Sequence, residues 1–223
     1  MMFVFHFSYD LNFFGYVQIN FLEEPFWANF RRVIVSSFLL LVGISIVLAN
    51  RQKLNIQKFT RRLILLIGYA ALVSLGSYFM FPESYIYFGI LHFIAVASVL
   101  GLFFRKFYWL NLVLGSVLVL LDSLYSNVFF NAPSINWLGL MTYLPHTEDY
   151  VPLIPWFGVV LIGMFIGKTL FADNNTPTWL AWNATNPITK TLAFGGRHSL
   201  HIYILHQPIF IGLLALISGQ AFF

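Results

Sequence analysis

Long apolar segments joined by short polar connections constrain this chain more than any other feature. A helix of about 20 apolar residues is long enough to cross the hydrocarbon core of a bilayer. Such segments lie at residues 33–49, 63–81, 85–104, 108–125, 151–171 and 199–218, and a further one covers residues 1–17. Only 9% of the residues are charged, against about 25% in soluble domains, so charges cannot cover a water-facing surface. We therefore predict an all-α fold, a polytopic transmembrane helical bundle of about seven spans, in one domain over residues 1–223.

The distribution of lysine and arginine predicts the orientation of these spans. The loop at residues 50–62 carries Arg51, Lys53, Lys58, Arg61 and Arg62. Because loops rich in Lys and Arg stay cytoplasmic, we expect this loop to be cytoplasmic. Counting spans from it places ten of the twelve basic residues inside, and only Arg31 and Arg32 depart from the pattern. The net charge of +4 is thus explained by topology, and we expect no nucleic-acid partner.

Four ionisable side chains stand out at membrane depth: His6, Asp10, His92 and His206. Such groups cost roughly 2.5–3.5 kcal/mol each to insert, which makes them candidates for function. His6 and Asp10 are four residues apart, so they lie on one face of a helix. They fit a general base that is oriented by a carboxylate, and they fit equally a structural hydrogen bond or a helix cap.

His92 and His206 also leave two interpretations open. His92, in "GILHFIAVAS", fits a catalytic group or a structural bond between helices, with small residues nearby that permit close packing. His206 is followed by Pro208, which removes a helical hydrogen bond and predicts a kink. His206 would then line a cavity or bond the carbonyl that the proline frees.

The stretch "GGRHSLH", residues 195–201, opens the last apolar segment on its expected cytoplasmic side. A helix N-terminus and an arginine fork both favour phosphate, so Arg197, with His198 and His201, is a candidate anchor for a phosphorylated ligand. The alternative is a positively charged anchor that only sets topology. The preceding "NPITKTLAFGG" predicts a short interfacial helix with Asn186 as N-cap and Gly195 at its end.

Asp149 and Trp156 lie where "EDYVPLIPWFG" enters its apolar segment from outside. Tryptophan is enriched at membrane interfaces, and the prolines would shape a vestibule in which backbone carbonyls face water or protein. Asp149 would meet a polar substrate there, or it would only cap a helix.

Several of these stretches carry a resemblance to a known family. The motifs are "HFSYDLNFFGY", "FLLLVGISIVLA", "YFGILHFIAVASVLG", "DYVPLIPWFGVVLIGMFIG" and "GRHSLHIYILHQPIF". Together they resemble the bacterial branch of the heparan-α-glucosaminide N-acetyltransferase-like membrane proteins, which belong to a wider set of multi-pass acyltransferases. The resemblance implies an acyl-CoA-dependent O- or N-acyltransferase of the bacterial cytoplasmic (inner) membrane. It would move an acetyl or other acyl group from cytosolic acetyl-CoA to a hydroxyl or amine of an extracytoplasmic glycan.

The resemblance also implies roles for individual residues. Related acyltransferases carry an essential histidine at the end of their first helix, and His6 matches it. Members usually precede that histidine with a half-helix bearing an Arg-Gly pair, so we expect this chain to be short at its N-terminus. Eukaryotic relatives carry a proposed acetyl-accepting histidine after the first span, but residues 7–91 contain no histidine, so an acetyl-histidine intermediate is not implied.

We therefore predict three groups of site residues. The catalytic group is His6 as general base, Asp10 as its orienting carboxylate, and His92. The donor group for acetyl-CoA is Arg197, His198 and His201, and the acceptor group is Asp149, Trp156 and His206. Either His92 or His206 would polarise the thioester carbonyl or bind the acceptor.

The expected partners are membrane lipids, acyl-CoA and the glycan, with a homodimer left open. No metal is predicted, and the absence of cysteine excludes thiolate metal sites and disulfides. The main competing function is a proton-coupled transporter that uses intramembrane His and Asp. A haem protein that pairs His92 with His206 and a non-catalytic scaffold are further alternatives.

Overall fold

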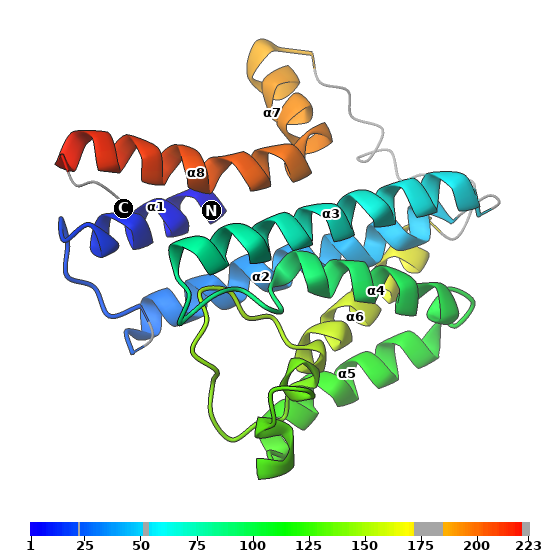
Figure 1. Cartoon of the computed structure of the whole chain (residues 1–223). Coiled ribbons are helices and arrows are strands. Elements are labelled where there is room, and N and C mark those ends of the chain that lie inside the picture. The colour runs from blue at the N-terminus through cyan, green and yellow to red at the C-terminus, as the bar shows by residue number, and fades with distance from the viewer. Residues whose placement is uncertain (22, 51–53, 172–184, 220–223) are drawn as a thin grey trace. The chain divides into compact units, whose positions relative to one another are not determined.

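The computed structural model describes residues 1–21, 23–50, 54–171 and 185–219, and it is helical (Figure 1). The long elements are α1 (Met2–Phe13), α2 (Pro25–Ala49), α3 (Ile56–Met80), α4 (Ile90–Phe104), α5 (Trp109–Leu124), α6 (Leu153–Phe171), α7 (Pro187–Arg197) and α8 (Ser199–Ser218). Two short 3₁₀ helices, η1 (Val128–Asn131) and η2 (Asn136–Leu138), lie between α5 and α6. Among the described residues there is no strand, so the predicted all-α fold is confirmed.

Among the described residues, four helices are long and apolar enough to cross a membrane: α2, α3, α6 and α8. The helices α4 and α5 are apolar but have only 15 and 16 residues, and α1 has 12. At 1.5 Å per residue, 15 residues rise only about 22 Å. In the predicted span at residues 85–104, residues 85–89 are irregular and the helix begins only at Ile90. A membrane protein is therefore confirmed, whereas the number of seven spans is not.

The chain forms two compact units. Unit 1 comprises Met1–Val35 and Thr178–Phe223, and unit 2 comprises Ser36–Pro177. Helix α2 contributes its first part to unit 1 and the rest to unit 2. The single domain and the cytoplasmic location of the 50–62 loop remain predictions, and Arg51 and Lys53 of that loop lie outside the described residues.

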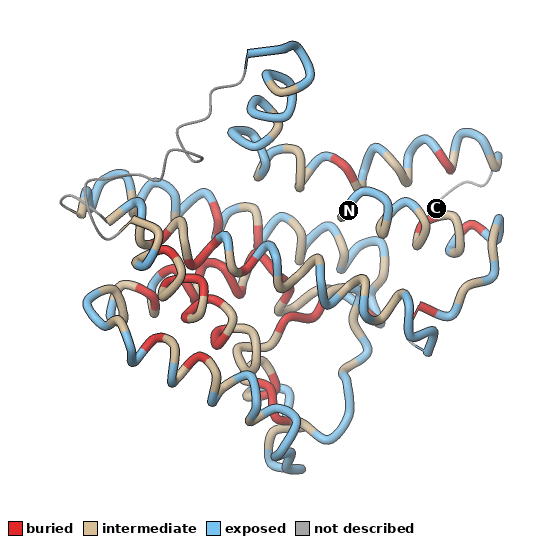
Figure 2. Tube along the Cα trace, turned by 180° about the vertical axis from the view of Figure 1, so that it is seen from behind, coloured by how far each residue is buried: buried red, intermediate tan, exposed pale blue. Residues whose placement is uncertain are grey.

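The core of unit 2 is built on close approaches between helix backbones. Gly43 of α2 faces the backbone of α6 at Val160 and Met164, and Gly115 of α5 faces Gly158 of α6. Small residues at such crossings let membrane helices approach closely. The largest fully buried side chains of the described residues belong to this unit, namely Phe93, Leu39, Leu161, Met164, Val151, Val160 and Asn111. Figure 2 shows the buried residues concentrated in this unit.

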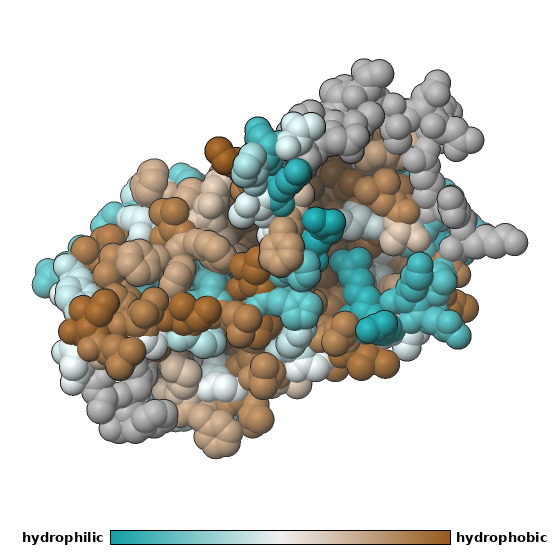
Figure 3. Space-filling view, turned by 90° about the horizontal axis from the view of Figure 1, so that it is seen from above, coloured by the Kyte–Doolittle hydropathy of each residue, from teal (hydrophilic) through white to brown (hydrophobic). Residues whose placement is uncertain are grey.

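Large apolar side chains also lie on the outside of the molecule. Phe79, Phe103 and Leu124 are 74%, 72% and 80% exposed, and Figure 3 shows apolar residues spread over the visible face. A soluble protein rarely exposes so much contiguous apolar surface. This surface is suited to lipid, in agreement with the composition.

In unit 1, α1 lies beside α8, and the two helices run in the same direction (Figure 1). The ring of Phe3 stacks on His206 with centroids 5.4 Å apart, and Phe7 contacts Phe210 at 5.4 Å. We call this contact the α1–α8 interface; its residues are Phe3, His6, Phe7 and Asp10 of α1 and His206, Gln207 and Phe210 of α8. It positions the first candidate site.

Helix α7 begins as predicted but ends later. The Asn186 side chain accepts a hydrogen bond from the Thr189 amide at 2.8 Å, and Pro187 is the first helical residue. The predicted end at Gly195 is wrong, because Gly195 does not adopt a positive φ and the helix continues to Arg197. Helix α8 then starts at Ser199 and continues through Pro208 to Ser218.

Candidate functional site

Asp10 is buried at the α1–α8 interface and binds α8. The residue is 3% exposed, and Oδ1 accepts a hydrogen bond of 2.6 Å from Gln207 Nε2. The other oxygen, Oδ2, has no hydrogen-bond partner among the described residues. No hydrogen bond between His6 and Asp10 is present among the described contacts, and the carboxylate instead accepts from the Gln207 amide of α8.

His6 contacts His206 through its ring. The two ring centroids are 5.0 Å apart with an interplanar angle of 65°, and His6 also contacts Phe5 at 5.8 Å. Within the described part of the chain, neither ring nitrogen of His6 makes a hydrogen bond. Both nitrogens are therefore available to a bound reactant.

The tautomer of His206 follows from its backbone contact. Its Nδ1 lies 2.6 Å from the Tyr203 carbonyl oxygen, and a carbonyl oxygen can only accept, so Nδ1 carries the proton. In the neutral ring Nε2 is then an acceptor. This atom is buried and unpartnered within the described residues. The Tyr203 carbonyl is not the one that Pro208 frees, which belongs to Ile204, four residues before the proline, so the predicted bond to a freed carbonyl is not the one observed. Nε2 is left to bind a donor.

Aromatic rings enclose the histidine pair. Phe3, Tyr203 and Phe210 lie 5.4–5.8 Å from the ring of His206. Apolar walls exclude water, and electrostatic interactions are stronger where water is excluded. In addition, the charge of Arg31 acts on His6, so one of the two arginines that depart from the charge pattern belongs to the electrostatic surroundings of this site.

In unit 2, His92 is held by the protein through both ring nitrogens. Nδ1 accepts a hydrogen bond from the Gly89 amide at 3.3 Å. Ser74 Oγ donates to the Ile86 carbonyl at 2.6 Å, so it accepts from His92 Nε2 at 3.1 Å. This geometry favours the structural interpretation of His92, and its catalytic role stays a prediction that would require one of these bonds to open.

Asp149 caps the N-terminus of α4. Its Oδ2 accepts a hydrogen bond of 2.8 Å from the Ile90 amide, one of the amides that a helix leaves unpaired. A Cβ on the neighbouring Gly89 would collide with this carboxylate. The sequence left a cap and a substrate role open for Asp149, and the structure adds that the cap belongs to a helix 59 positions earlier in the chain.

The segments on either side of this cap are bonded to each other. Ser84 Oγ donates to Glu148 Oε1 at 2.6 Å, and the Glu148 amide donates to the Ser84 carbonyl at 2.9 Å. Next to them, the Tyr150 hydroxyl donates to the Asn136 carbonyl at 2.5 Å, and burial raises the pKa of Tyr150. Trp156 follows in α6 and is partly buried. Hydrogen bonds therefore hold the loops at this end of unit 2 in fixed positions.

The three predicted donor residues meet at the junction of α7 and α8. Arg197 ends α7, His198 is the single residue between the helices, and His201 lies in the first turn of α8. All three are exposed, and the rings of His198 and His201 are 6.4 Å apart. His198 Nδ1 lies 3.0 Å from the Phe194 carbonyl oxygen, which fixes the ring at the junction.

Sequence reasoning missed Gln207 as the partner of Asp10. The sequence showed that Gln207, a polar residue beside a proline in an apolar helix, needs a partner, but it did not show which residue that partner is.

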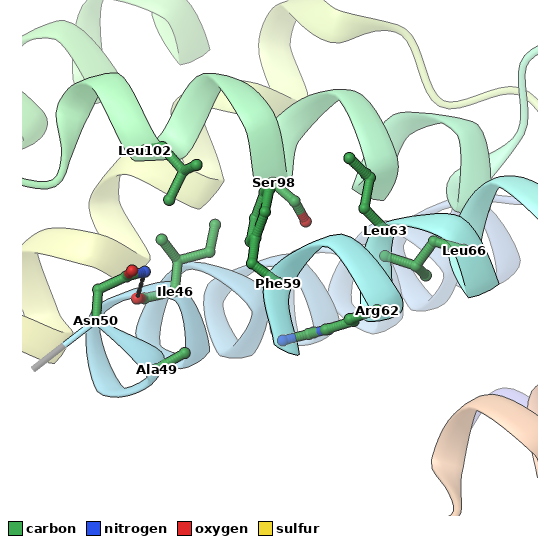
Figure 4. Close-up of a pocket in the computed structure, with 9 residues that line it drawn as sticks. All are labelled: Ile46, Ala49, Asn50, Phe59, Arg62, Leu63, Leu66, Ser98 and Leu102. Atoms are coloured by element: carbon green, nitrogen blue, oxygen red, sulfur yellow. Dashed lines mark hydrogen bonds between the residues drawn. The ribbon is translucent and has the colours of Figure 1, made fainter. Parts of the chain in front are cut away.

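Sequence reasoning also missed a small pocket of about 30 Å³ between α2, α3 and α4 of unit 2, whose lining includes Asn50, Arg62 and Ser98 (Figure 4). This volume is on the order of one water molecule, far below that of an acyl-CoA.

Within the described residues, no group of three or more His, Asp or Glu side chains could hold a metal ion.

No curated protein and no solved structure shows significant similarity to the chain. A family model described as "Heparan-alpha-glucosaminide N-acetyltransferase, catalytic" matches residues 1–208. This match includes α1 and α8 as far as Pro208, and thus His6, Asp10, His206 and Gln207. The chain therefore belongs to the family of heparan-alpha-glucosaminide N-acetyltransferase catalytic domains.

Proposed function

We propose that the protein moves an acetyl or other acyl group from cytosolic acetyl-CoA to a hydroxyl or amine of an extracytoplasmic glycan. The observation that carries this proposal is the family match over residues 1–208, which contains both helices of the α1–α8 interface. The four long apolar helices support a bilayer location. We propose the bacterial cytoplasmic membrane, with the 50–62 loop on the cytoplasmic side.

His6 is the general base of the proposed reaction. It takes the proton from the acceptor O–H or N–H while that oxygen or nitrogen attacks the thioester carbonyl carbon. The C–S bond breaks, the acyl group stays on the acceptor, and the sulfur of CoA leaves with the proton that His6 returns. The unoccupied ring nitrogens of His6 support this role, in contrast to those of His92.

His206 and Asp10 bind the acceptor. Since Nε2 of neutral His206 bears no proton, it accepts a hydrogen bond and does not polarise a carbonyl. Asp10 Oδ2 is likewise an acceptor without a partner in the described residues. Of the two roles that the sequence left open for His206, the geometry favours contact with a donor group on the acceptor substrate.

Arg197, His198 and His201 bind the phosphates of acetyl-CoA. His206 lies eight positions after His198, the residue that precedes α8, which corresponds to a helical rise of about 12 Å. The pantetheine arm of CoA is longer than this rise, so phosphates held at the α7–α8 junction leave the thioester free to reach the level of His206. We also propose that Asp149 and Trp156 bind the acceptor, because we expect both residues to lie at the outer face of the membrane.

The test uses the purified full chain in detergent or liposomes with radiolabelled acetyl-CoA and a panel of amino and hydroxyl glycans. General-base removal costs about 10²- to 10⁴-fold, so we expect His6→Ala to lose at least 100-fold in transfer. His146→Ala is the matched control, because His146 is an exposed loop residue and its loss should change nothing. A folded His6→Ala protein that transfers acetyl groups at the normal rate refutes the assignment.

A second measurement separates the acyltransferase from the transporter. We expect calorimetry to detect acetyl-CoA binding to the wild type and much weaker binding to Arg197→Ala. A proton-coupled transporter would move its solute without any acyl donor. Proton uptake by liposomes in the absence of acetyl-CoA, with no binding of acetyl-CoA, would favour that alternative.

A further inference from the structure

Gln207 makes one short hydrogen bond and leaves its other polar atom unused. Its Nε2 donates to Asp10 Oδ1 at 2.6 Å, and its Oε1 is buried without a hydrogen-bond partner in the described residues. The carboxylate fixes the orientation of the amide, because a carboxylate oxygen accepts from NH₂ and would repel the amide oxygen. Gln207 therefore holds Asp10 through its NH₂ group alone.

The bond divides the two oxygens of Asp10 into different roles. Oδ1 is bound to α8, whereas Oδ2 is buried and free of protein contacts in the described part of the chain. A carboxylate that is hydrogen-bonded through one oxygen cannot rotate freely about its side-chain bonds. The bond from Gln207 to Oδ1 therefore sets the direction of Oδ2. His206 precedes Gln207 on the same helix, and its Nε2 is also a buried acceptor without a partner among the described residues.

We propose that Gln207 is a positioning residue, which holds Asp10 so that Oδ2 accepts a hydrogen bond from the substrate beside His6. This inference rests on the proposed acyl transfer, and Gln207 acts only through Asp10. A substrate group that donates hydrogen bonds would complete the site, since Asp10 Oδ2, Gln207 Oε1 and His206 Nε2 are all acceptors. Without the amide, Asp10 would lose the contact that sets its orientation.

The experiment compares Gln207→Met, Asp10→Asn and the double variant in the full chain. Positioning partners of reactive groups are worth about 10- to 100-fold, so we expect Gln207→Met to lower kcat by that factor with KM for acetyl-CoA unchanged. Because Gln207 acts through Asp10, adding Gln207→Met to Asp10→Asn should cause no further loss. Gln18→Met is the matched control, since Gln18 is exposed, and it should behave as wild type.

Gln207→Glu is the second variant. It keeps the shape of the side chain but replaces the donor with a carboxyl group, and we expect a similar loss of kcat. A folded Gln207→Met or Gln207→Glu protein with wild-type kcat overturns the proposal. A loss that is fully additive with Asp10→Asn also overturns it, because the amide would then act elsewhere.

An activity-independent readout separates this inference from the proposed function. In protein labelled with ¹⁵N-glutamine, Gln207→Met identifies the side-chain NH₂ signal of Gln207. We expect Asp10→Asn to shift this signal strongly and to leave the Gln18 signal in place. If Asp10→Asn shifts the signal but the wild-type protein transfers no acyl group, the acyl-transfer proposal alone is refuted. If Asp10→Asn leaves the signal unshifted, the positioning role of Gln207 is overturned.

Discussion

Replacing Gly43 with alanine should destabilise unit 2 through a clash with the backbone of α6. A Cβ at Gly43 would meet the Val160 carbonyl oxygen and would lie 2.8 Å from the Met164 nitrogen and 2.9 Å from the Gly163 carbonyl carbon. Real Cβ atoms do not approach so closely, and backbone atoms of a packed helix cannot turn aside as a flexible side chain can. The two helices must therefore separate.

The size of the effect follows from this geometry. Inserting a carbon into a well-packed core costs about 1–3 kcal/mol. Three backbone atoms oppose the new methyl group, and separation of the helices would also loosen Leu39, Leu161 and Met164, which are fully buried. We therefore expect a loss near the upper end, about 3 kcal/mol in the free energy of unfolding.

The assay is unfolding of the purified protein in mixed micelles with increasing SDS, followed by circular dichroism. The matched control is Gly68→Ala in α3, where a Cβ has no neighbour within 4 Å. Alanine has the higher helix propensity, by about 0.8–1 kcal/mol, so this control should be neutral or stabilising. A Gly43→Ala protein within about 0.5 kcal/mol of wild type, a difference typical of harmless surface changes, would refute the reasoning.

Three further predictions concern the N-terminal ends of two helices and the loop before α6. Asp149→Ala should lower the free energy of unfolding by about 1 kcal/mol through loss of the cap on Ile90, and faster hydrogen exchange at the Ile90 amide would locate the effect. Asn186→Ala should cost α7 about 1 kcal/mol in the same way, with faster exchange at the Thr189 amide as the measurement; unchanged exchange would contradict it. Burial raises the pKa of Tyr150, so its neutral form is favoured in the folded state. The stability this provides is complete below the usual tyrosine pKa of about 10 and is lost as the pH rises above it. Tyr150→Phe should make unfolding less sensitive to alkaline pH, and an identical alkaline profile in wild type and variant would show that Tyr150 does not carry the effect.

The sequence by itself determined the features that depend on neighbouring residues. The apolar segments predicted the helices, because burial of about 20 successive apolar residues in lipid needs no information about distant contacts. Local capping chemistry predicted the start of α7 at Asn186 and Pro187. The four-residue spacing placed His6 and Asp10 on one face of α1, and the motifs that contain them predicted the family that the match over residues 1–208 confirmed.

Only the tertiary structure decided which groups meet. Asp10 pairs with Gln207, 197 positions away in the chain, and Asp149 caps a helix 59 positions before it. His92 has both ring nitrogens occupied, whereas those of His6 make no hydrogen bond within the described residues. Helical periodicity fixes the face on which a side chain lies, but the rotation and depth at which helices pack select its partner, and these depend on the shape of every side chain between them.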